Sequence, residues 1–175
     1  MRAFIGLGGN VGDTRRAFVG ALRELDDIGQ VARVSSLYET KPRDFADQPV
    51  FTNAVVELAT DLDPAELLFH LKRIEVLLGR DPQGIRYGPR VVDLDILAFD
   101  GRCVTDTDLD LIVPHPRLQE RRFVLEPMCE LEPGLRPWRD CADLRTDVTV
   151  ADLLPSVADQ EVRRIAGPDW ADRPA

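Results

Sequence analysis

One segment, residues 86–99, constrains the fold of this chain more than any other, and it reads R-Y-G-P-R-V-V-D-L-D-I-L-A-F. After its arginines, β-branched and other apolar residues are interrupted only by Asp93 and Asp95, which is typical of a strand in a packed sheet. Alternate side chains of a strand share a face, so both carboxylates are expected on one face, about 7 Å apart. The segment therefore predicts a central strand that presents two carboxylates to one side.

A carboxylate pair of this kind has two interpretations. An antiparallel strand often shows its polar face to water, and for an isolated D-x-D this is the more frequent case. The pair can also hold divalent cations. Arg86 and Arg90 lie just upstream, around a Gly-Pro turn, and guanidinium groups bind phosphate through paired hydrogen bonds. Carboxylates beside arginines therefore favour a nucleoside triphosphate ligand with Mg²⁺.

The charge of the chain is unevenly distributed. Its 175 residues include 22 basic and 31 acidic ones, for a net charge of −9, and 44% are hydrophobic. This composition suits one compact domain and argues against a surface for nucleic acid or anionic membrane. Between Lys72 and Arg122, however, nine basic residues balance nine acidic ones. A locally balanced region on an acidic protein fits a small anionic ligand better than a polymer.

The cysteines and the amino terminus indicate the compartment. Cys103, Cys129 and Cys141 are odd in number and show no C-x-x-C spacing, which predicts neither a disulfide framework nor a zinc site. We expect free thiols in a reducing environment. The first apolar run is too short for a signal peptide, and no stretch has the length and hydropathy of a membrane span. These features predict a cytoplasmic protein.

Hydrophobic periodicity predicts six core elements. Strands are expected over residues 3–8, 31–38, 51–60 and 91–99, and helices over residues 14–25 and 64–78. Gly8–Asp13 is expected to form a tight turn after the first strand. This order predicts an α+β ferredoxin-like βαββαβ sandwich with an antiparallel sheet. Additional C-terminal elements follow, including a short helix over residues 150–154. We expect a single domain over residues 1–165 and a flexible tail over residues 166–175.

Three further residues attract attention. Phe51 and Asn53 share a face of the third predicted strand, and an amide among apolar neighbours needs partners for both its ends. Asn53 is either satisfied locally or reads the edge of a flat heterocycle, with Phe51 supplying ring contact. His115 lies between two prolines, where a histidine is more often a polar anchor than a catalyst.

Five motifs carry a family resemblance when they are taken together. They are I-G-L-G-G-N-x-G-D, S-S-L-Y-E-T-K-P, D-Q-P-x-F-x-N-A-V, R-Y-G-P-R-V-V-D-L-D-I-L and V-P-H-P-R-L-x-E-R-x-F-V-L-x-P. In this order, from residue 3 to about residue 132, they resemble the 6-hydroxymethyl-7,8-dihydropterin pyrophosphokinase family. The resemblance implies a ferredoxin-like fold, two Mg²⁺ ions and an ATP-dependent diphosphotransferase of folate biosynthesis. Such an enzyme moves pyrophosphate from ATP to the hydroxymethyl oxygen of the pterin and releases AMP.

The resemblance also implies a role for each site residue. The metal ligands would be Asp93 and Asp95. The catalytic residues would be Arg80, Arg90, Asp95 and His115. The residues that contact ATP would be Lys72, Glu75, Arg80, Arg86, Arg90, His115, Arg117 and Arg121. The residues around the pterin would be Thr40, Pro42, Phe51, Asn53, Asp95 and Phe123.

The loop over residues 79–87 is expected to be mobile in the free protein and to close over bound substrates. Pro82 stands where the family often has a basic residue, so Arg80 and Arg86 would carry the phosphate contacts of this loop. We expect the partners to be the small-molecule substrates alone, with no nucleic acid and no membrane, and we expect the protein to be a monomer.

Two other protein classes compete with this interpretation. A metal-dependent nuclease or phosphohydrolase would use the same two aspartates with water as the acceptor. A ferredoxin-like RNA-binding module is disfavoured by the net charge and by the lack of paired aromatic residues in an RNP-like strand.

Overall fold

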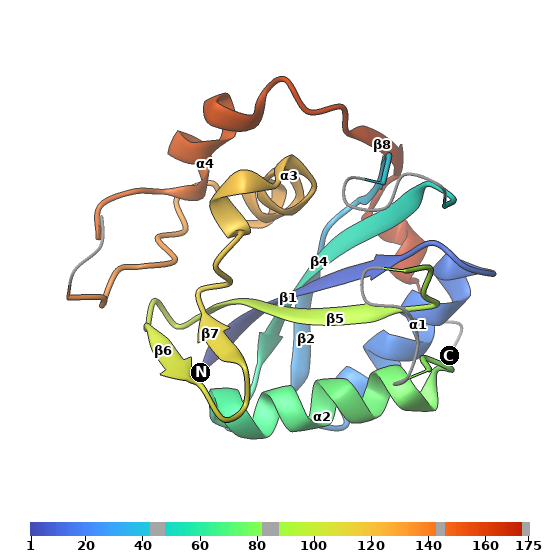
Figure 1. Ribbon diagram of the computed structural model, residues 1–175, viewed down its shortest axis with the longest axis horizontal. Coiled ribbons are helices and arrows are strands. Elements are labelled where there is room, and N and C mark those ends of the chain that lie inside the picture. The colour runs from blue at the N-terminus through green and yellow to red at the C-terminus, as the bar shows by residue number, and fades with distance from the viewer. Residues whose placement is uncertain (43–47, 82–87, 143–145, 173–175) are drawn as a thin grey trace.

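The computed structural model describes residues 1–42, 48–81, 88–142 and 146–172 (Figure 1). The first part of the chain contains β1 (Arg2–Gly9), α1 (Thr14–Asp26), β2 (Gln30–Val34), β3 (Leu37–Thr40), β4 (Phe51–Ala59), α2 (Pro64–Leu77) and β5 (Asp93–Phe99). A hairpin of β6 (Val104–Asp106) and β7 (Leu111–Val113) follows. The remainder contains α3 (Arg122–Leu131), α4 (Val150–Leu153), β8 (Arg163–Ala166) and short 3₁₀ turns. No helix in these ranges is long and apolar enough to cross a membrane.

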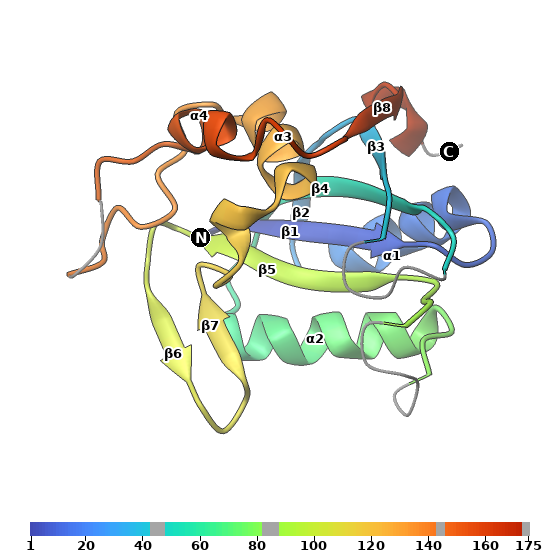
Figure 2. The same cartoon turned by 45° about the horizontal axis from the view of Figure 1, so that its top comes forward.

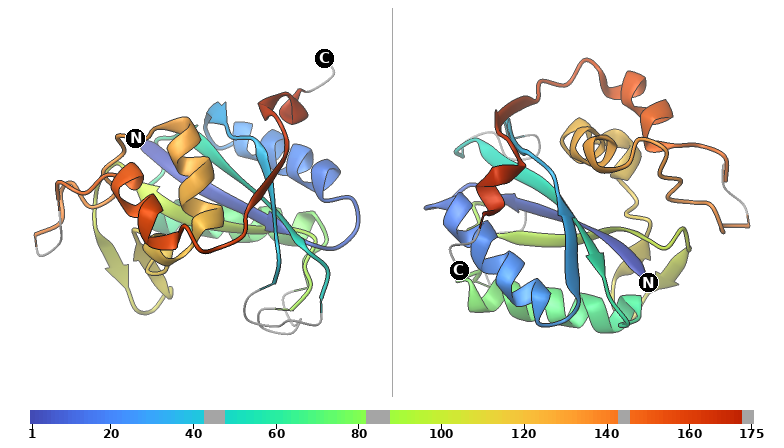
Figure 3. Two further views of the ribbon diagram at one scale, coloured as in Figure 1. Left: turned by 90° about the horizontal axis from the view of Figure 1, so that it is seen from above. Right: turned by 180° about the vertical axis from the view of Figure 1, so that it is seen from behind.

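The main sheet is antiparallel and lies between two layers of helices. Its strand order is β5-β1-β4-β3-β8, and β2 also pairs with β4. Seen from behind, α1 and α2 lie together on one face of the sheet (Figure 3). Figure 2 shows α3 on the opposite face, where it contacts β4 and β3.

Strand alternation supplies each layer with its own core. Ala3, Ile5 and Leu7 of β1 point toward the helices α1 and α2, whereas Phe4 points toward α3. The α1–α2 core is completed mainly by residues such as Phe18, Leu22, Leu67, Leu71, Leu94 and Phe99. The α3 core contains Val55, Leu97, Val124, Leu125 and Met128. Both faces of the sheet are thus covered, but α3 leaves part of its face open.

The local signals that start α2 act together. Asp63 caps the helix by accepting from the backbone N–H groups of Ala65 and Glu66, at 2.9 Å each. Glu66 reaches back to the backbone N–H of Asp63, so a capping box forms, and Pro64 occupies the first turn. The predicted helix over residues 64–78 is confirmed to within one residue.

Three expectations need correction. The strand expected over residues 31–38 is interrupted after Val34, because buried Ser35 turns its hydroxyl to the backbone N–H of Val55, at 2.9 Å. Gly9, expected in the turn after the first strand, still belongs to β1. The ten-residue helix α3 was not predicted, because Pro127 lies inside it and a proline argues against a helix interior.

Glu130, in the last turn of α3, holds this helix against the sheet. Glu130 accepts from the backbone N–H of Ser36 at 3.0 Å, from the Ser36 hydroxyl at 2.7 Å and from the Tyr38 hydroxyl at 2.8 Å. Burial and the bond to this carboxylate raise the pKa of Tyr38 well above its ordinary value. The tyrosine is therefore a neutral donor throughout the physiological range.

Replacing Tyr38 with phenylalanine should lower the free energy of unfolding by about 1.5 kcal/mol, since the bond to a charged acceptor is lost and the ring stays. Urea denaturation followed by circular dichroism measures the change. Ser156→Ala, which removes an exposed hydroxyl that donates to Leu153, is the control and should change stability by less than about 0.5 kcal/mol. Equal losses of stability for the two variants would mean that the hydrogen bond from Tyr38 to Glu130 adds nothing to the stability of the fold.

The carboxyl-terminal segment is not a loose tail up to Asp172. Strand β8 pairs with β3, and Trp170 is only 2% exposed. Its ring packs edge-on against Phe18, with centroids 6.0 Å apart, and its indole N–H donates to the backbone carbonyl of Ser35 at 2.8 Å. The expected flexible tail over residues 166–175 is therefore wrong for residues 166–172; residues 173–175 lie outside the described ranges.

The cysteine prediction is wrong for one pair. Cys103, between β5 and β6, forms a disulfide with Cys141, and their Cα atoms are 5.3 Å apart. The pair is 38 residues apart in sequence, so only the return of the chain after α3 brings the two thiols together. Cys129 is free, as expected.

Candidate active site

A cleft of about 980 Å³ occupies the part of the sheet face that α3 leaves open. Its floor follows from strand register. Gly8 of β1 lies opposite Asn53 of β4 and Asp93 of β5, and Gly6 lies opposite Asp95. Residues paired across strands share a face, so β1 places two glycines between Asn53 and Val55 of β4 on one side and the two aspartates of β5 on the other. The missing side chains leave a trough along the middle of the sheet.

These glycines line the cleft, and the sequence analysis did not assign them to the site. A Cβ atom at Gly6 would lie 3.3 Å from the methyl groups of Leu97, and one at Gly8 would lie 3.6 Å from Oδ1 of Asn53. Gly6 and Gly8 fall within the strand expected over residues 3–8, and their spacing of two residues was the signal that they share a face. A glycine within a strand often marks a place where a ligand approaches the backbone closely, and the sequence analysis did not use this signal.

The two aspartates lie on the same face, as predicted, but in different environments. Asp93 binds Arg90 at 2.7 Å and also pairs with Arg80. Burial alone would raise the pKa of Asp93, but the two guanidinium groups outweigh it and hold the pKa below its ordinary value. For Asp95, burial and the charge of Asp93 raise the pKa. Among the described residues, no hydrogen bond or ion pair reaches the Asp95 carboxylate.

The pair fits a divalent cation that arrives with its substrate. Mg²⁺ keeps several waters and is often bound by one or two carboxylates together with substrate phosphates. Within the described ranges, no group of three or more acidic, histidine or cysteine side chains is placed to hold a metal ion. Asp93 and Asp95 would therefore supply part of a coordination shell, and water and phosphate oxygens would complete it.

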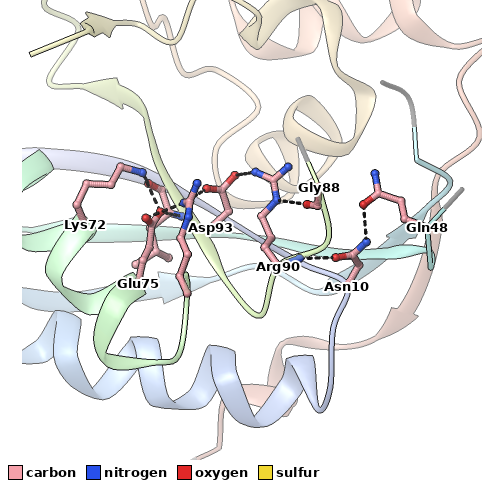
Figure 4. Close-up of polar contacts among 9 residues, drawn as sticks. Asn10, Gln48, Lys72, Glu75, Gly88, Arg90 and Asp93 are labelled. Carbon is pink, nitrogen blue, oxygen red and sulfur yellow. Dashed lines mark hydrogen bonds and ion pairs between the residues drawn. The ribbon is translucent and has the colours of Figure 1, made fainter. Parts of the chain in front are cut away.

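Glu75 lies behind the cleft wall rather than on it. Its buried carboxylate accepts from the Lys72 ammonium at 2.8 Å, from Arg80 at 2.7 Å and from the backbone N–H of Leu94 at 2.7 Å (Figure 4). It joins the end of α2 to β5 and holds two cations at the cleft. Its place among the residues expected to contact ATP is therefore indirect.

An arginine guanidinium group lies over each of two aromatic rings in the cleft. The Arg90 guanidinium lies 5.7 Å from the centroid of Phe51, and that of Arg121 lies 5.6 Å from the centroid of Phe123. Asn53 is buried between β1 and β3, and its amide donates to the Thr40 hydroxyl at 3.0 Å. The apolar half of the cleft thus adjoins its basic half directly.

His115 is held in one tautomer. Its Nδ1 accepts from the backbone N–H of Arg117 at 3.0 Å, so the ring proton of neutral His115 is on Nε2. Burial lowers the pKa of His115, although the Asp95 charge acts against it. The ring is therefore a neutral donor at its Nε2 end.

The structure brings nearly all predicted site residues to one cleft. Those that line it are Thr40, Pro42, Phe51, Asn53, Lys72, Arg80, Arg90, Asp93, Asp95, His115, Arg117, Arg121 and Phe123. Glu75 supports the wall from behind, and Arg86, with Pro82 and most of the loop over residues 79–87, lies outside the described ranges.

The chain is similar in sequence to several curated proteins. The chain is 50% identical over 128 residues to a folate synthesis bifunctional protein of Arabidopsis thaliana, covering 73% of this chain and 26% of that protein. It is 46% identical over 132 residues to 2-amino-4-hydroxy-6-hydroxymethyldihydropteridine pyrophosphokinase of Bacillus subtilis, covering 74% of this chain and 77% of that protein. The chain thus spans about a quarter of its plant relative.

A crystal structure of Plasmodium falciparum HPPK-DHPS shares the fold, with a TM-score of 0.69 at 15% identity, covering 90% of this chain and 45% of that one. The family model described as 7,8-dihydro-6-hydroxymethylpterin-pyrophosphokinase matches residues 4–133, which include most of β1, the whole of β5 and the arginines of the cleft. This chain belongs to the 7,8-dihydro-6-hydroxymethylpterin-pyrophosphokinase family.

Proposed function

We propose that this protein transfers the pyrophosphoryl group of ATP to the hydroxymethyl oxygen of 6-hydroxymethyl-7,8-dihydropterin and releases AMP, as a step of folate biosynthesis. One observation carries the proposal. The carboxylate pair Asp93 and Asp95 lines the same cleft as a group of basic side chains and a pocket formed by Phe51, Asn53 and Phe123. Such a cleft can hold a triphosphate and a flat heterocycle end to end, with the carboxylates at their junction.

The basic wall suits the nucleotide. Arg80 and Arg90 are now neutralised by Asp93, and an arriving triphosphate offers them stronger bidentate partners. His115 can donate from Nε2 to a phosphate oxygen, and Glu75 holds Lys72 at the cleft wall. Arg117 and Arg121 complete the set on the far side of the cleft. We assign Glu75 and Arg86 to the nucleotide side as well, Glu75 through Lys72 and Arg80.

The apolar half suits the pterin. Phe51 and Phe123 would lie against the two faces of the heterocycle, and Asn53 would pair with its polar edge. Thr40 holds the Asn53 amide, and Pro42 borders the same pocket. A buried amide that is only partly satisfied by Thr40 has capacity left for a ligand.

The protein contributes mainly position and charge. Asp93 and Asp95 would hold two Mg²⁺ ions, which neutralise phosphate charge and increase the acidity of the attacking hydroxyl. Asp95 lines the cleft, and burial raises the pKa of its carboxyl, so we expect it to accept the hydroxyl proton. Arg80, Arg90 and His115 stabilise negative charge on the transferred group. Confinement in the cleft keeps the hydroxymethyl oxygen, rather than water, in line with the phosphorus.

We also infer the finer features expected from the sequence. The order β5-β1-β4 with β2 and β3 beside β4, and both α1 and α2 on one face, supports a ferredoxin-like layout. One chain supplies all the cleft residues named above, which supports a single domain over residues 1–165 that acts as a monomer. The cytoplasmic location stays a prediction, and a relative from Pisum sativum is named as mitochondrial.

The product pattern tests the function. The protein is incubated with ATP, Mg²⁺ and the hydroxymethyl-dihydropterin, and nucleotides are separated by chromatography. We expect AMP and pterin diphosphate in equal amounts, and neither product when the pterin or Mg²⁺ is omitted. ADP or inorganic phosphate formed at a comparable rate without pterin would identify a phosphohydrolase instead.

Replacing Asn53 with alanine should weaken pterin binding about 30-fold and change ATP binding less than about threefold. Loss of the amide leaves polar groups of the bound heterocycle unpaired, which is costly in a dry pocket. Calorimetric titration with each ligand separately measures both affinities. Thr52→Val, next to Asn53 but bonded to Thr14 at 3.2 Å, is the control. Equal losses for both ligands would show that Asn53 is only structural.

A further inference from the structure

Asn10 follows β1 directly and joins two segments that are far apart in sequence. It is 7% exposed. Its Oδ1 accepts from the backbone N–H of Arg90 at 2.9 Å, and its own backbone N–H donates to the Arg90 carbonyl at 2.9 Å. Its Nδ2 donates to Oε1 of Gln48 at 3.0 Å and to the carbonyl of Pro49 at 3.2 Å. Figure 4 shows Asn10 lying between Arg90 and Gln48.

The partners determine which way the amide faces. The backbone N–H of Arg90 can only donate, and the carbonyl of Pro49 can only accept. Oδ1 must therefore face Arg90, and Nδ2 must face Pro49. Both hydrogens of Nδ2 are used. An aspartate at this position could still accept from Arg90, but it would turn an oxygen toward the oxygens of Gln48 and Pro49.

The two segments carry opposite halves of the cleft. Gln48 and Pro49 lead directly into β4, whose first residues include Phe51 and Asn53 on the pterin side. Arg90 belongs to the phosphate side, where it binds Asp93 at 2.7 Å. Gln48 and Arg90 line the cleft, whereas Asn10 does not. Asn10 therefore acts on a ligand only through its neighbours.

We propose that Asn10 is a positioning residue that holds the pterin side and the phosphate side of the cleft in one relative placement. This inference rests on the proposed pyrophosphoryl transfer. In that reaction the acceptor oxygen is held by one half and the phosphoryl group by the other, and a misplacement of about 1 Å can cost about 100-fold in rate. Binding of either substrate alone uses one half at a time. The hydrogen bonds of Asn10 to Arg90, Gln48 and Pro49, which we call the clasp, therefore affect the rate more than either affinity.

Asn10→Asp separates this role from a merely structural one, because it keeps the bond to Arg90 and removes the donor to Gln48 and Pro49. At saturating ATP, Mg²⁺ and pterin we expect its turnover of AMP formation to fall about 30-fold. The dissociation constants of a non-hydrolysable ATP analogue and of the pterin, each measured alone by calorimetry, should change less than about threefold. The melting temperature should stay within about 4 °C of the parent value.

A compensating variant tests the bond itself. Adding Gln48→Lys to Asn10→Asp places an ammonium donor opposite the new carboxylate, and we expect turnover to return to within about fivefold of the parent protein. Gln48→Lys alone should be slow, because two donors then face each other. Gln30→Glu, an exposed site on β2, adds the same charge change away from the cleft and is the control.

The outcomes separate the two proposals. Normal turnover by Asn10→Asp, or a loss confined to the two affinities, would overturn the positioning role while AMP formation by the parent protein upholds the proposed function. A loss of turnover that Gln48→Lys does not restore would likewise show that the clasp is not its cause. If the parent protein itself forms no AMP, the proposed function is wrong and the inference is overturned with it.

Discussion

Replacing Asp95 with asparagine is expected to reduce the turnover of AMP formation by at least about 1,000-fold, and Asp93→Asn should do the same. Each substitution keeps the shape of the side chain and removes the negative charge that would hold the cations. Because these cations would neutralise the phosphates in the transition state of the proposed reaction, the loss should fall on turnover and remain at saturating substrate. Steady-state assays of AMP formation measure it.

The two variants should differ in stability, and in opposite directions. The folded state raises the pKa of Asp95, so its ionisation opposes folding at pH values above the ordinary carboxyl pKa. Asp95→Asn should therefore raise the free energy of unfolding at pH 7. The folded state lowers the pKa of Asp93, so its charge stabilises the fold above the ordinary pKa, and this contribution is lost as the pH falls through the lowered pKa. Asp93→Asn should lower the stability, because Arg80 and Arg90 lose their partner.

Urea denaturation of both variants and of the parent protein at pH 7 measures these stability changes. In the assay of AMP formation, near-normal turnover of both variants would mean that the pair is only a solvated polar strand face. Stability changes of the same sign in both variants would contradict the opposite pKa directions of Asp93 and Asp95. A site that gains stability when its key charge is removed is typical of functional groups held in unfavourable surroundings.

Replacing Trp170 with alanine is expected to lower the free energy of unfolding by about 3–5 kcal/mol. The indole is almost fully buried against Phe18 of α1, and its removal leaves a large cavity and an unpaired Ser35 carbonyl. Trp170→Phe keeps most of the ring but loses the N–H group, so it should cost less, about 1–2 kcal/mol. Urea denaturation followed by circular dichroism gives both values.

Trp138 offers a matched control, since it is a half-buried tryptophan outside the α1–α2 core. Its replacement by alanine should cost less than that of Trp170. A loss below about 1 kcal/mol for Trp170→Ala would mean that the carboxyl-terminal segment is only loosely attached, as its sequence suggests.

The candidate site was largely predictable because its residues lie in short motifs. Strand alternation alone predicts that Asp93 and Asp95 lie on one face, and the arginines beside them predict a ligand that carries phosphate. Glu75 shows the limit of this reasoning. A carboxylate on a helix next to Lys72 looks like a ligand contact, and only the docking of α2 on β5 reveals that it is buried and bonded to Leu94.

The sequence by itself determined the first strand, the positions of α1 and α2, the ends of α2 and the face on which both aspartates lie. These features depend on residues that are close to one another in the sequence, so local sequence patterns are enough to predict them. The tertiary structure alone decided the glycine trough, the Cys103–Cys141 bond, the docking of Trp170 and the clasp of Asn10. Each joins segments separated by tens of residues, and no local pattern specifies which distant partner a buried polar or aromatic group will find.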